Sequence, residues 1–244
     1  MRLKTITCSG ANEYTSFEPL IRLLSWWPRA ELGIQVSGKK AAFSTARYWW
    51  IEKLFSVTKE VDFPIHIALH VNSDWVEDFC QGYIHDELRR WLEFYNFKTG
   101  TPFIQRVQLN FKIGREKTPD LKKLSSAIKE CRQRFIFSYC KENAAFIQKV
   151  YETGLKFDLL YDASYGEGIL AEKYCPPVFP DILQGYAGGL SPENVEEHLE
   201  QINKVVPSGK SFTIDAEGKL KGPDGHFSLE KCEEYLRIAS RLTN

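Results

Sequence analysis

The sequence predicts an α/β protein that forms a single (β/α)8 barrel over residues 1–244. Short apolar runs alternate with helical patterns along the whole chain, and this alternation implies a parallel sheet. There are eight such runs, which favours a closed barrel over an open, doubly wound sheet. No Gly-x-Gly-x-x-Gly motif follows the first run, so a dinucleotide-binding fold is disfavoured.

Eight segments have the apolar pattern of buried strands. They are residues 3–8, 31–36, 65–71, 104–111, 134–139 and 157–161, the run that starts at Ile182, and residues 211–215. Helical spacing follows the strands, for example at Phe17, Leu20 and Leu24 after the first. Thr118-Pro119-Asp120 is a helix start. Extra helix is expected in the long connection between the third and fourth strands, around residues 82–103.

Composition supports one domain with a real core. Of the 244 residues, 43% are hydrophobic and 26% are charged, as is usual for a globular protein. Barrels of this type commonly reach this length as one domain. We see no linker, charge block or low-complexity segment that would mark a domain boundary.

Charge and cysteine usage exclude several classes of function. Lys plus Arg and Asp plus Glu each number 32, so no net field attracts nucleic acid or a membrane surface. The six cysteines show no Cys-x-x-Cys spacing, and no signal peptide or membrane-spanning stretch is visible. We expect a cytoplasmic monomer or homodimer with free thiols, a small-molecule ligand, no cofactor, no metal, and no nucleic-acid or membrane partner.

The stretch from Ile182 to Asn194 carries the clearest local signal. An apolar run is followed by Gly188-Gly189, which lets the backbone turn where a side chain would obstruct it. Ser191 suits a helix N-cap, and Pro192 suits the first helical position. A strand, a diglycine turn and a capped helix together present amides to an anionic ligand. The alternative is an ordinary tight loop.

In such a barrel the active site forms at the C-terminal ends of the strands. The polar residues predicted there are Cys8, His70, Asn72, Gln108, Asn110, Ser138, Asp162, Asp215 and Glu217. Cys8 suits a base or nucleophile if its thiolate is stabilised, and otherwise a small buried residue. Asp162 suits acid catalysis if burial raises its pKa, and otherwise a turn. Asp215 either points inward or is structural.

A second group of candidates comes from charge and imidazole chemistry. Lys39, Lys40 and Arg47 form a basic loop after the second strand, and this loop suits a carboxylate or phosphate. His70 suits the lining of the pocket. It cannot share a metal with His66, because four strand residues separate the two by about 13 Å.

Three stretches of the sequence fit one known pattern. They are Ile6-Thr-Cys8 followed by Gly10, Leu159-Leu-Tyr-Asp162 with Gly166 and Gly168, and Gly188-Gly-Leu-Ser-Pro-Glu-Asn194. Together they resemble the phosphoribosylanthranilate isomerase family, whose first strand ends in a Lys-Ile-Cys-Gly motif. The third stretch is almost identical to that family's seventh turn. Val107-Gln-Leu-Asn110 and Val71-Asn72 resemble its fourth and third strands.

The resemblance implies an Amadori rearrangement, in which an aminoribose phosphate opens and a proton moves to give an aminoketose. It assigns the role of general base to Cys8 and that of general acid to Asp162. It also implies that Arg47 binds the anthranilate carboxylate of the substrate. Gly189 and the start of the seventh helix would hold the phosphate, so that Gly188, Ser191, His70, Asn110 and Asp215 complete the expected substrate site. The expected function is therefore an isomerase for a small phosphorylated sugar derivative.

Three departures from the family support an alternative. Asn110 stands where the family usually has histidine, and the basic loop precedes Arg47 by a longer interval. Asp215 is followed by Ala216-Glu217-Gly218, where the family has a Ser-Ser-Gly turn that grips phosphate. A carboxylate at Glu217 would repel a phosphate. The alternative is a diverged barrel without isomerase activity, either a small-molecule-binding protein or an enzyme for a non-phosphorylated ligand.

Overall fold

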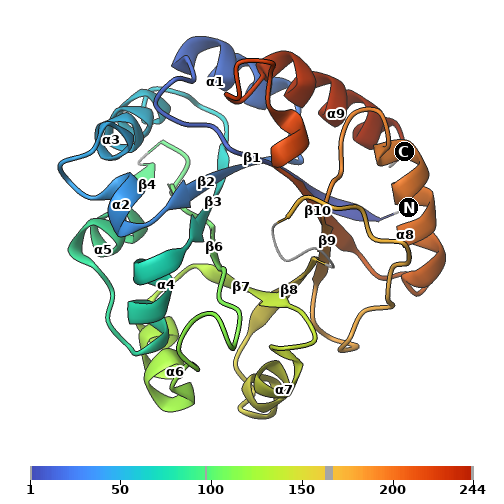
Figure 1. Ribbon diagram of the computed structural model, residues 1–244. Helices are drawn as coiled ribbons and strands as arrows, with labels where there is room; N and C mark the ends of the chain where they lie inside the picture. The colour runs from blue at the N-terminus through green and yellow to red at the C-terminus, as the bar shows by residue number, and fades with distance from the viewer. Residues whose placement is uncertain (1, 97, 163–166, 243–244) are drawn as a thin grey trace. The chain divides into compact units, whose positions relative to one another are not determined.

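The computed structural model describes residues 2–96, 98–162 and 167–242 (Figure 1). The barrel strands are β1 (Leu3–Ser9), β2 (Ala30–Val36), β3 (His66–Val71), β6 (Arg106–Leu109), β7 (Arg134–Tyr139), β8 (Phe157–Asp162), β9 (Gln184–Ala187) and β10 (Phe212–Ala216). They close in the order β1-β10-β9-β8-β7-β6-β3-β2. The predicted (β/α)8 barrel is confirmed.

Helices follow seven of the eight barrel strands, as the alternating pattern predicts, whereas the described residues 167–183 after β8 contain no helix. They are α1 (Phe17–Trp26), α2 (Gly38–Ala41), α3 (Ala46–Thr58), α4 (Ser73–Cys80), α5 (Asp86–Glu93), α6 (Leu121–Glu130), α7 (Ala144–Glu152), α8 (Val195–Val205) and α9 (Leu229–Arg241), with a short 3-10 helix, η1 (Gly218–Leu220). Asp120 caps α6 by accepting hydrogen bonds from the amides of Lys122 and Lys123 at 3.0 Å each. These bonds lower the pKa of Asp120.

The chain divides into two compact units, which we call the terminal unit (residues 1–33 and 158–244) and the central unit (residues 34–157). Each unit is described here by itself. The sequence prediction of one domain stays a prediction.

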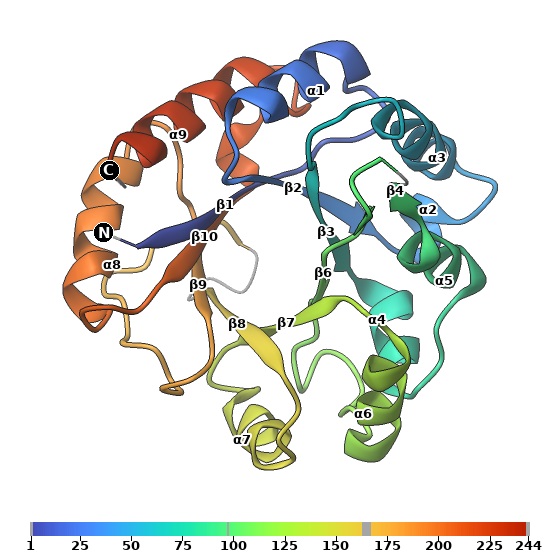
Figure 2. The same cartoon turned by 180° about the vertical axis from the view of Figure 1, so that it is seen from behind.

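In the terminal unit, β1 pairs in parallel with β10 and with the start of β2, β10 pairs with β9, and β9 pairs with β8. Helices α1, α8 and α9 lie on the outer side of these strands (Figure 2). Two fully buried rings on this side are Tyr186 and Phe212, whose centroids lie 6.2 Å apart. Apolar packing against the helices therefore uses one face of each strand and leaves the other face for polar groups.

In the central unit, β3, β6 and β7 pair in parallel, and Phe79 of α4 packs against Phe135 of β7 with ring centroids 5.4 Å apart. The long connection contains α5, as predicted, together with an antiparallel hairpin of β4 (Tyr95–Asn96) and β5 (Thr101–Pro102). The Glu52 carboxylate of α3 binds two residues of α5. It accepts hydrogen bonds from Arg90 at 3.0 and 3.1 Å and from the Trp91 indole at 2.8 Å.

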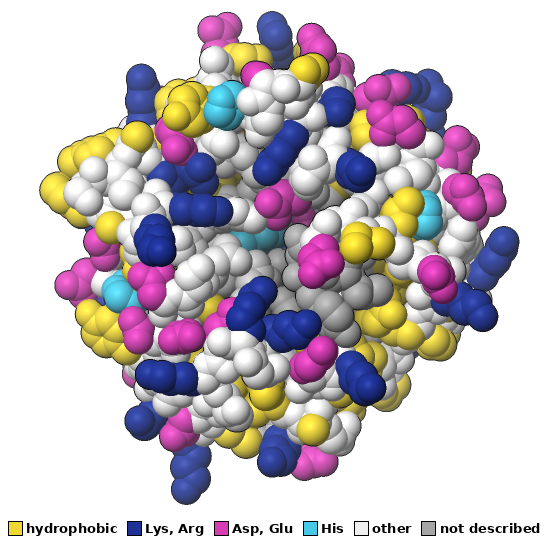
Figure 3. All heavy atoms as spheres, in the orientation of Figure 1, with side chains coloured by type: hydrophobic (Ala, Val, Ile, Leu, Met, Phe, Trp, Pro, Cys, Tyr) yellow, Lys and Arg dark blue, Asp and Glu magenta, His cyan; other side chains and the backbone are white. Residues whose placement is uncertain are grey.

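Lys and Arg side chains are interspersed with Asp and Glu on the face drawn in Figure 3, as the equal numbers of the two signs lead one to expect. None of the helices within the described ranges combines the length and apolar character needed to span a membrane.

We predict that Glu52→Ala destabilises the protein by about 2 kcal/mol, because the substitution leaves the N–H of the buried Trp91 and the Arg90 guanidinium without this acceptor. Urea unfolding followed by circular dichroism measures the change. Glu60→Ala is the control, since the Glu60 side chain is 82% exposed and its ion pair with Lys98 has a long separation of 3.8 Å; it should change stability by less than about 0.5 kcal/mol. Equal effects of the two substitutions would contradict the prediction.

Candidate functional site

Two hydroxyl–carboxylate pairs lie on the polar face of the terminal unit. The Ser9 hydroxyl donates to Oδ1 of Asp215 at 2.7 Å, and the Thr7 hydroxyl donates to Oε1 of Glu31 at 2.8 Å. All four side chains are buried. Thr7 and Ser9 share a face of β1 because side chains alternate along a strand. Asp215 therefore bonds the neighbouring strand β1 through Ser9, and whether it acts on a ligand or is structural stays open at this point.

Strand register arranges the acidic residues in a row. Asp162 of β8 is opposite Ala187 of β9, and Asp215 of β10 is opposite Thr7 of β1. Because Tyr186 is opposite Ile214, Ala187 and Asp215 are at the same level of the sheet. Asp162 and Asp215 are therefore two strands apart with the small side chain of Ala187 between them. Asp162 is half-buried at the end of its strand.

Cys8 lies on the other face of β1. Its side chain forms a hydrogen bond with Cys232 of α9, and both thiols are fully buried. Burial raises the pKa of Cys8 well above its ordinary value, and the bond to Cys232 raises it further. A general base needs the thiolate, which this environment disfavours. The alternative interpretation of Cys8, a small buried residue, fits this environment, and the predicted role as base loses its physical basis.

The position of Gly10 in the sequence indicates which residue of β1 corresponds to the cysteine of the family motif. In the family motif cysteine comes directly before glycine, whereas in this chain Ser9 comes directly before Gly10. Counted from the glycine, Ser9 takes the place of the family's cysteine, and Cys8 takes the place of its isoleucine. The two alignments differ by one residue of register, which moves the matched side chain to the opposite face of the strand.

The diglycine turn has the conformation that the sequence predicts. The φ angles of Gly188 and Gly189 are 103° and 64°, values that residues with a side chain rarely adopt. A Cβ atom on Gly189 would lie 2.7 Å from the carbonyl oxygen of Gly168. The segment that contains Gly168 therefore packs directly on the turn. Gly166, the other glycine of that loop in the resemblance, lies outside the described residues.

The helix after the turn begins later than predicted. Its N-cap is Asn194, not Ser191, and α8 starts at Val195. The Asn194 side chain explains this correction: its Oδ1 accepts from the Ser191 amide at 2.9 Å, and its Nδ2 donates to the Gly189 carbonyl at 3.0 Å. The Ser191 hydroxyl bonds to Glu193 and lowers the pKa of that carboxyl. The Ser191 amide, a predicted anion donor, is thus already engaged within the turn.

Glu217 follows β10 and is half-buried. Its Cγ lies 3.7 Å from the place where a Cβ on Gly10 would stand. The Glu217 side chain therefore lies beside Gly10, the residue that directly follows Ser9 and β1. This location adds negative charge close to the strand ends, where a phosphate would have to bind.

The central unit brings several predicted residues into one neutral network. Oδ1 of Asn110 accepts from Gln108 Nε2 at 2.9 Å and from the Ser138 hydroxyl at 3.0 Å, and Nδ2 of Asn110 donates to Asn72 Oδ1 at 3.0 Å. Asn72 in turn donates to the His70 carbonyl at 2.7 Å. His70 is buried and opposite Gln108 in register. The network fixes Asn110, the residue that replaces the family's histidine.

Arg47 lies in the first turn of α3 and donates to the Gln35 carbonyl at 3.2 Å. Lys40 donates to Oε1 of the same glutamine at 2.8 Å. Both cations therefore lie near the C-terminal end of β2, as the sequence predicts, but they lie on helices rather than on a loop: Lys39 and Lys40 are in α2, and Arg47 is in α3. The binding of a carboxylate by Arg47 stays a prediction.

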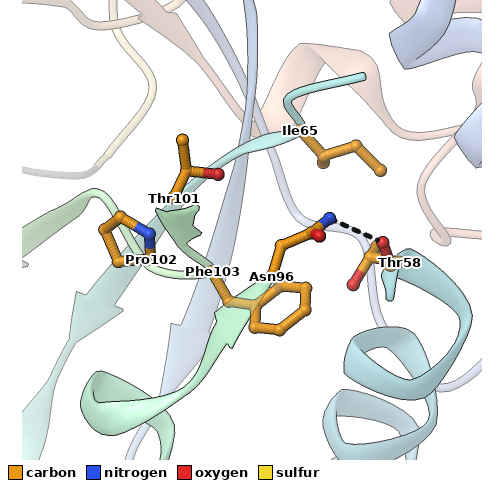
Figure 4. Close-up of a pocket in the computed structure, with 6 residues that line it drawn as sticks. All are labelled: Thr58, Ile65, Asn96, Thr101, Pro102 and Phe103. Carbon is orange, nitrogen blue, oxygen red and sulfur yellow. Dashed lines mark hydrogen bonds between the residues drawn. The ribbon is translucent and has the colours of Figure 1, made fainter. Parts of the chain in front are cut away.

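A small pocket in the central unit contains none of these residues. It lies beside the β4–β5 hairpin and is lined by Thr58, Ile65, Asn96, Thr101, Pro102 and Phe103 (Figure 4). Asn96 donates to the Thr58 carbonyl at 3.1 Å and accepts from the amides of Lys98 and Thr99. These bonds satisfy the Asn96 amide and anchor the hairpin. Within the described residues, no group of His, Cys, Asp and Glu is arranged to hold a metal ion.

Solved structures share this architecture. Phosphoribosyl anthranilate isomerase from Thermus thermophilus is 17% identical, with a TM-score of 0.57, and the match covers 98% of this chain and 99% of that one. A phosphoribosyl anthranilate isomerase in complex with reduced 1-(o-carboxyphenylamino)-1-deoxyribulose 5-phosphate is 13% identical, with a TM-score of 0.56 and coverage of 98% and 100%. A mutant tryptophan synthase alpha-subunit from Pyrococcus furiosus is 12% identical, with a TM-score of 0.54 and coverage of 98% and 99%.

At these identities the likeness concerns the fold: the chain is a barrel like that of phosphoribosylanthranilate isomerase. The third structure carries the name of a different enzyme, as expected for an architecture that hosts many activities. The sequence matches no protein-family model, and it has no significant match to a curated protein. The chemistry must therefore be argued from the site.

We predict that Cys8 resists alkylation in the folded protein. Its raised pKa leaves little thiolate at pH 8, and burial blocks the reagent, so modification by iodoacetamide should be at least about 100-fold slower than in the unfolded chain. Peptide mass spectrometry after timed reaction, with and without guanidinium, measures both rates. Rapid modification of Cys8 in the native protein would contradict the prediction and restore a reactive thiolate.

Proposed function

We propose that the protein is an isomerase that acts on a small sugar derivative by proton transfer, with Asp162 as general acid. One observation carries the proposal: Asp162 ends β8 directly opposite Ala187, and the Gly188-Gly189 turn begins at the next residue of β9. An acid at a strand end thus lies beside the diglycine turn. Both features occupy the end of a barrel where active sites form.

The reaction follows from what a carboxylic acid can do at that position. An N-linked aldose opens when Asp162, in its protonated form, gives a proton to the ring oxygen as the C1–O bond breaks. The nitrogen lone pair then forms a C1=N bond. A base must next remove the C2 proton to produce the enolamine, which becomes the aminoketose. The resemblance in the motifs and the likeness in fold support this reaction class.

Two observations favour a second candidate, an enzyme or binding protein for a non-phosphorylated ligand. The Ser191 amide is engaged by Asn194, and Glu217 adds a carboxylate near the strand ends. At a spacing of about 4 Å and an effective dielectric of about 20, one unit charge repels another by about 4 kcal/mol. A dianionic phosphate near Glu217 would therefore bind weakly.

The test is a steady-state assay with phosphoribosylanthranilate and with its unphosphorylated ribosyl analogue. Asp162→Asn removes the proton donor and should lower kcat by about 10²- to 10⁴-fold on whichever compound is converted. Asp62→Asn, at an exposed position of the central unit, is the matched control and should leave kcat unchanged. Conversion of the unphosphorylated compound alone selects the second candidate in its enzymatic form.

Failure to convert either compound would overturn the isomerase proposal. Turnover by the native protein that survives in Asp162→Asn would overturn the role of Asp162.

A further inference from the structure

The reaction needs a base as well as an acid, and Cys8 lies on the wrong face of β1. We infer that Asp215, held in place by the Ser9 hydroxyl, is the general base that removes the C2 proton; this inference rests on the proposed function. Its starting observation is the 2.7 Å hydrogen bond from Ser9 Oγ to Asp215 Oδ1 between the last residue of β1 and the penultimate residue of β10.

The position of Asp215 in the sheet suits it to act on the same ligand as Asp162. The two residues are at one level, on the same face, with β9 between them. Neighbouring strands are about 4.8 Å apart, so their Cα atoms are separated by about 10 Å. Ala187 fills little of the intervening space, and the turn at Gly188 continues from it. A sugar carbon chain placed over Ala187 would have one carboxyl group on each side.

A second buried carboxylate shows why Asp215 is the one selected. Glu31 lies in the same row, opposite Thr7, and accepts a hydrogen bond from the Thr7 hydroxyl. Its strand, however, continues for five residues to Val36, so Glu31 lies below the strand ends. Asp215 is followed by a single strand residue, Ala216. Of the two carboxylates, Asp215 is therefore the one close to the end of the barrel where a ligand enters.

The proton balance is simple. The Asp215 carboxylate takes the proton from C2, the electrons of the C2–H bond form the C1=C2 bond, and the electrons of C1=N return to nitrogen. C1 of the enolamine then takes the proton held by Asp215, while the 2-hydroxyl gives its proton to the Asp162 carboxylate and the ketone forms at C2. Both residues thereby return to their starting protonation states. No atoms are gained or lost, and no oxidant or reductant is needed.

Ser9 is a positioning residue in this step. A carboxylate must present a lone pair toward the proton that it removes, and a misplaced base loses much of its rate. The Ser9 hydroxyl fixes the Oδ1 side of Asp215 and so sets the orientation of the carboxylate. It makes no bond to the substrate.

The experiment measures kcat and KM of the native protein and of Asp215→Asn, Ser9→Ala, Ser9→Thr and Glu31→Gln, with phosphoribosylanthranilate and its unphosphorylated analogue. Asp215→Asn should lower kcat by about 10²- to 10⁴-fold. Ser9→Ala should lower kcat by about tenfold with little change in KM, and Ser9→Thr, which keeps the hydroxyl, should recover most of it. Glu31→Gln is the matched control and should stay within about threefold of native kcat, with circular dichroism confirming the fold of every variant.

The outcomes separate the two proposals. Native turnover that persists in Asp215→Asn, or that falls in Glu31→Gln instead, overturns the assignment of the base and leaves the proposed isomerase intact. If Asp215→Asn fails to fold, unchanged kcat in Ser9→Ala overturns it in the same way, and the loss in Ser9→Ala with recovery in Ser9→Thr supports it. No turnover by the native protein overturns the proposed function and, with it, this inference.

Discussion

The parallel pairing of β1 with β10 is the constraint on which the candidate site depends. The two strands come from opposite ends of the chain, and the Ser9–Asp215 hydrogen bond spans 206 residues of sequence. The ladder places Thr7 opposite Asp215 and Cys8 opposite Ala216. Because side chains alternate, the same ladder directs Ser9 and Asp215 to one face and Cys8 to the other. A shift of one residue would exchange the chemistry of the two faces.

The two faces of β1 show how burial separates structural from chemical roles. On the helix side, Cys8 and Cys232 lie together, both buried, and burial raises the pKa of the Cys8 thiol. On the other side, the hydroxyls of Thr7 and Ser9 satisfy buried carboxylates at 2.7–2.8 Å. Buried charges require such partners, since an uncompensated carboxylate is costly in a medium of low dielectric constant. In the central unit the corresponding polar side chains are neutral, and they bond one another in the network around Asn110.

Much of the fold was predictable from the sequence because its signals are local. Apolar runs, helical spacing and the cap at Asp120 each depend on a few neighbouring residues. The diglycine turn was also predictable, since only glycine readily adopts the φ angles found at Gly188 and Gly189. The start of α8 was not, because Ser191 and Asn194 are both good capping residues and local sequence does not choose between them.

The partners of the polar residues were harder to predict, because they are set by pairing between distant strands. Ser9 is not among the predicted site residues, although it directly precedes Gly10. The bond of Asn110 to Asn72 depends on the neighbouring ladders of β3 and β6. Polar residue types at the predicted strand ends thus indicate the candidate region. The face toward which each side chain points depends on the register of strand pairing, which only the structure shows.

A crystal structure of the protein with reduced 1-(o-carboxyphenylamino)-1-deoxyribulose 5-phosphate tests the central claim most directly. This stable compound carries the carbon chain on which acid and base would act. We predict that its C1 and C2 atoms lie over Ala187, within about 4 Å of both the Asp162 and Asp215 carboxylates, with Cys8 sequestered against α9. A ligand whose reacting carbons contact neither carboxylate, or contact the Cys8 sulfur, would contradict the claim.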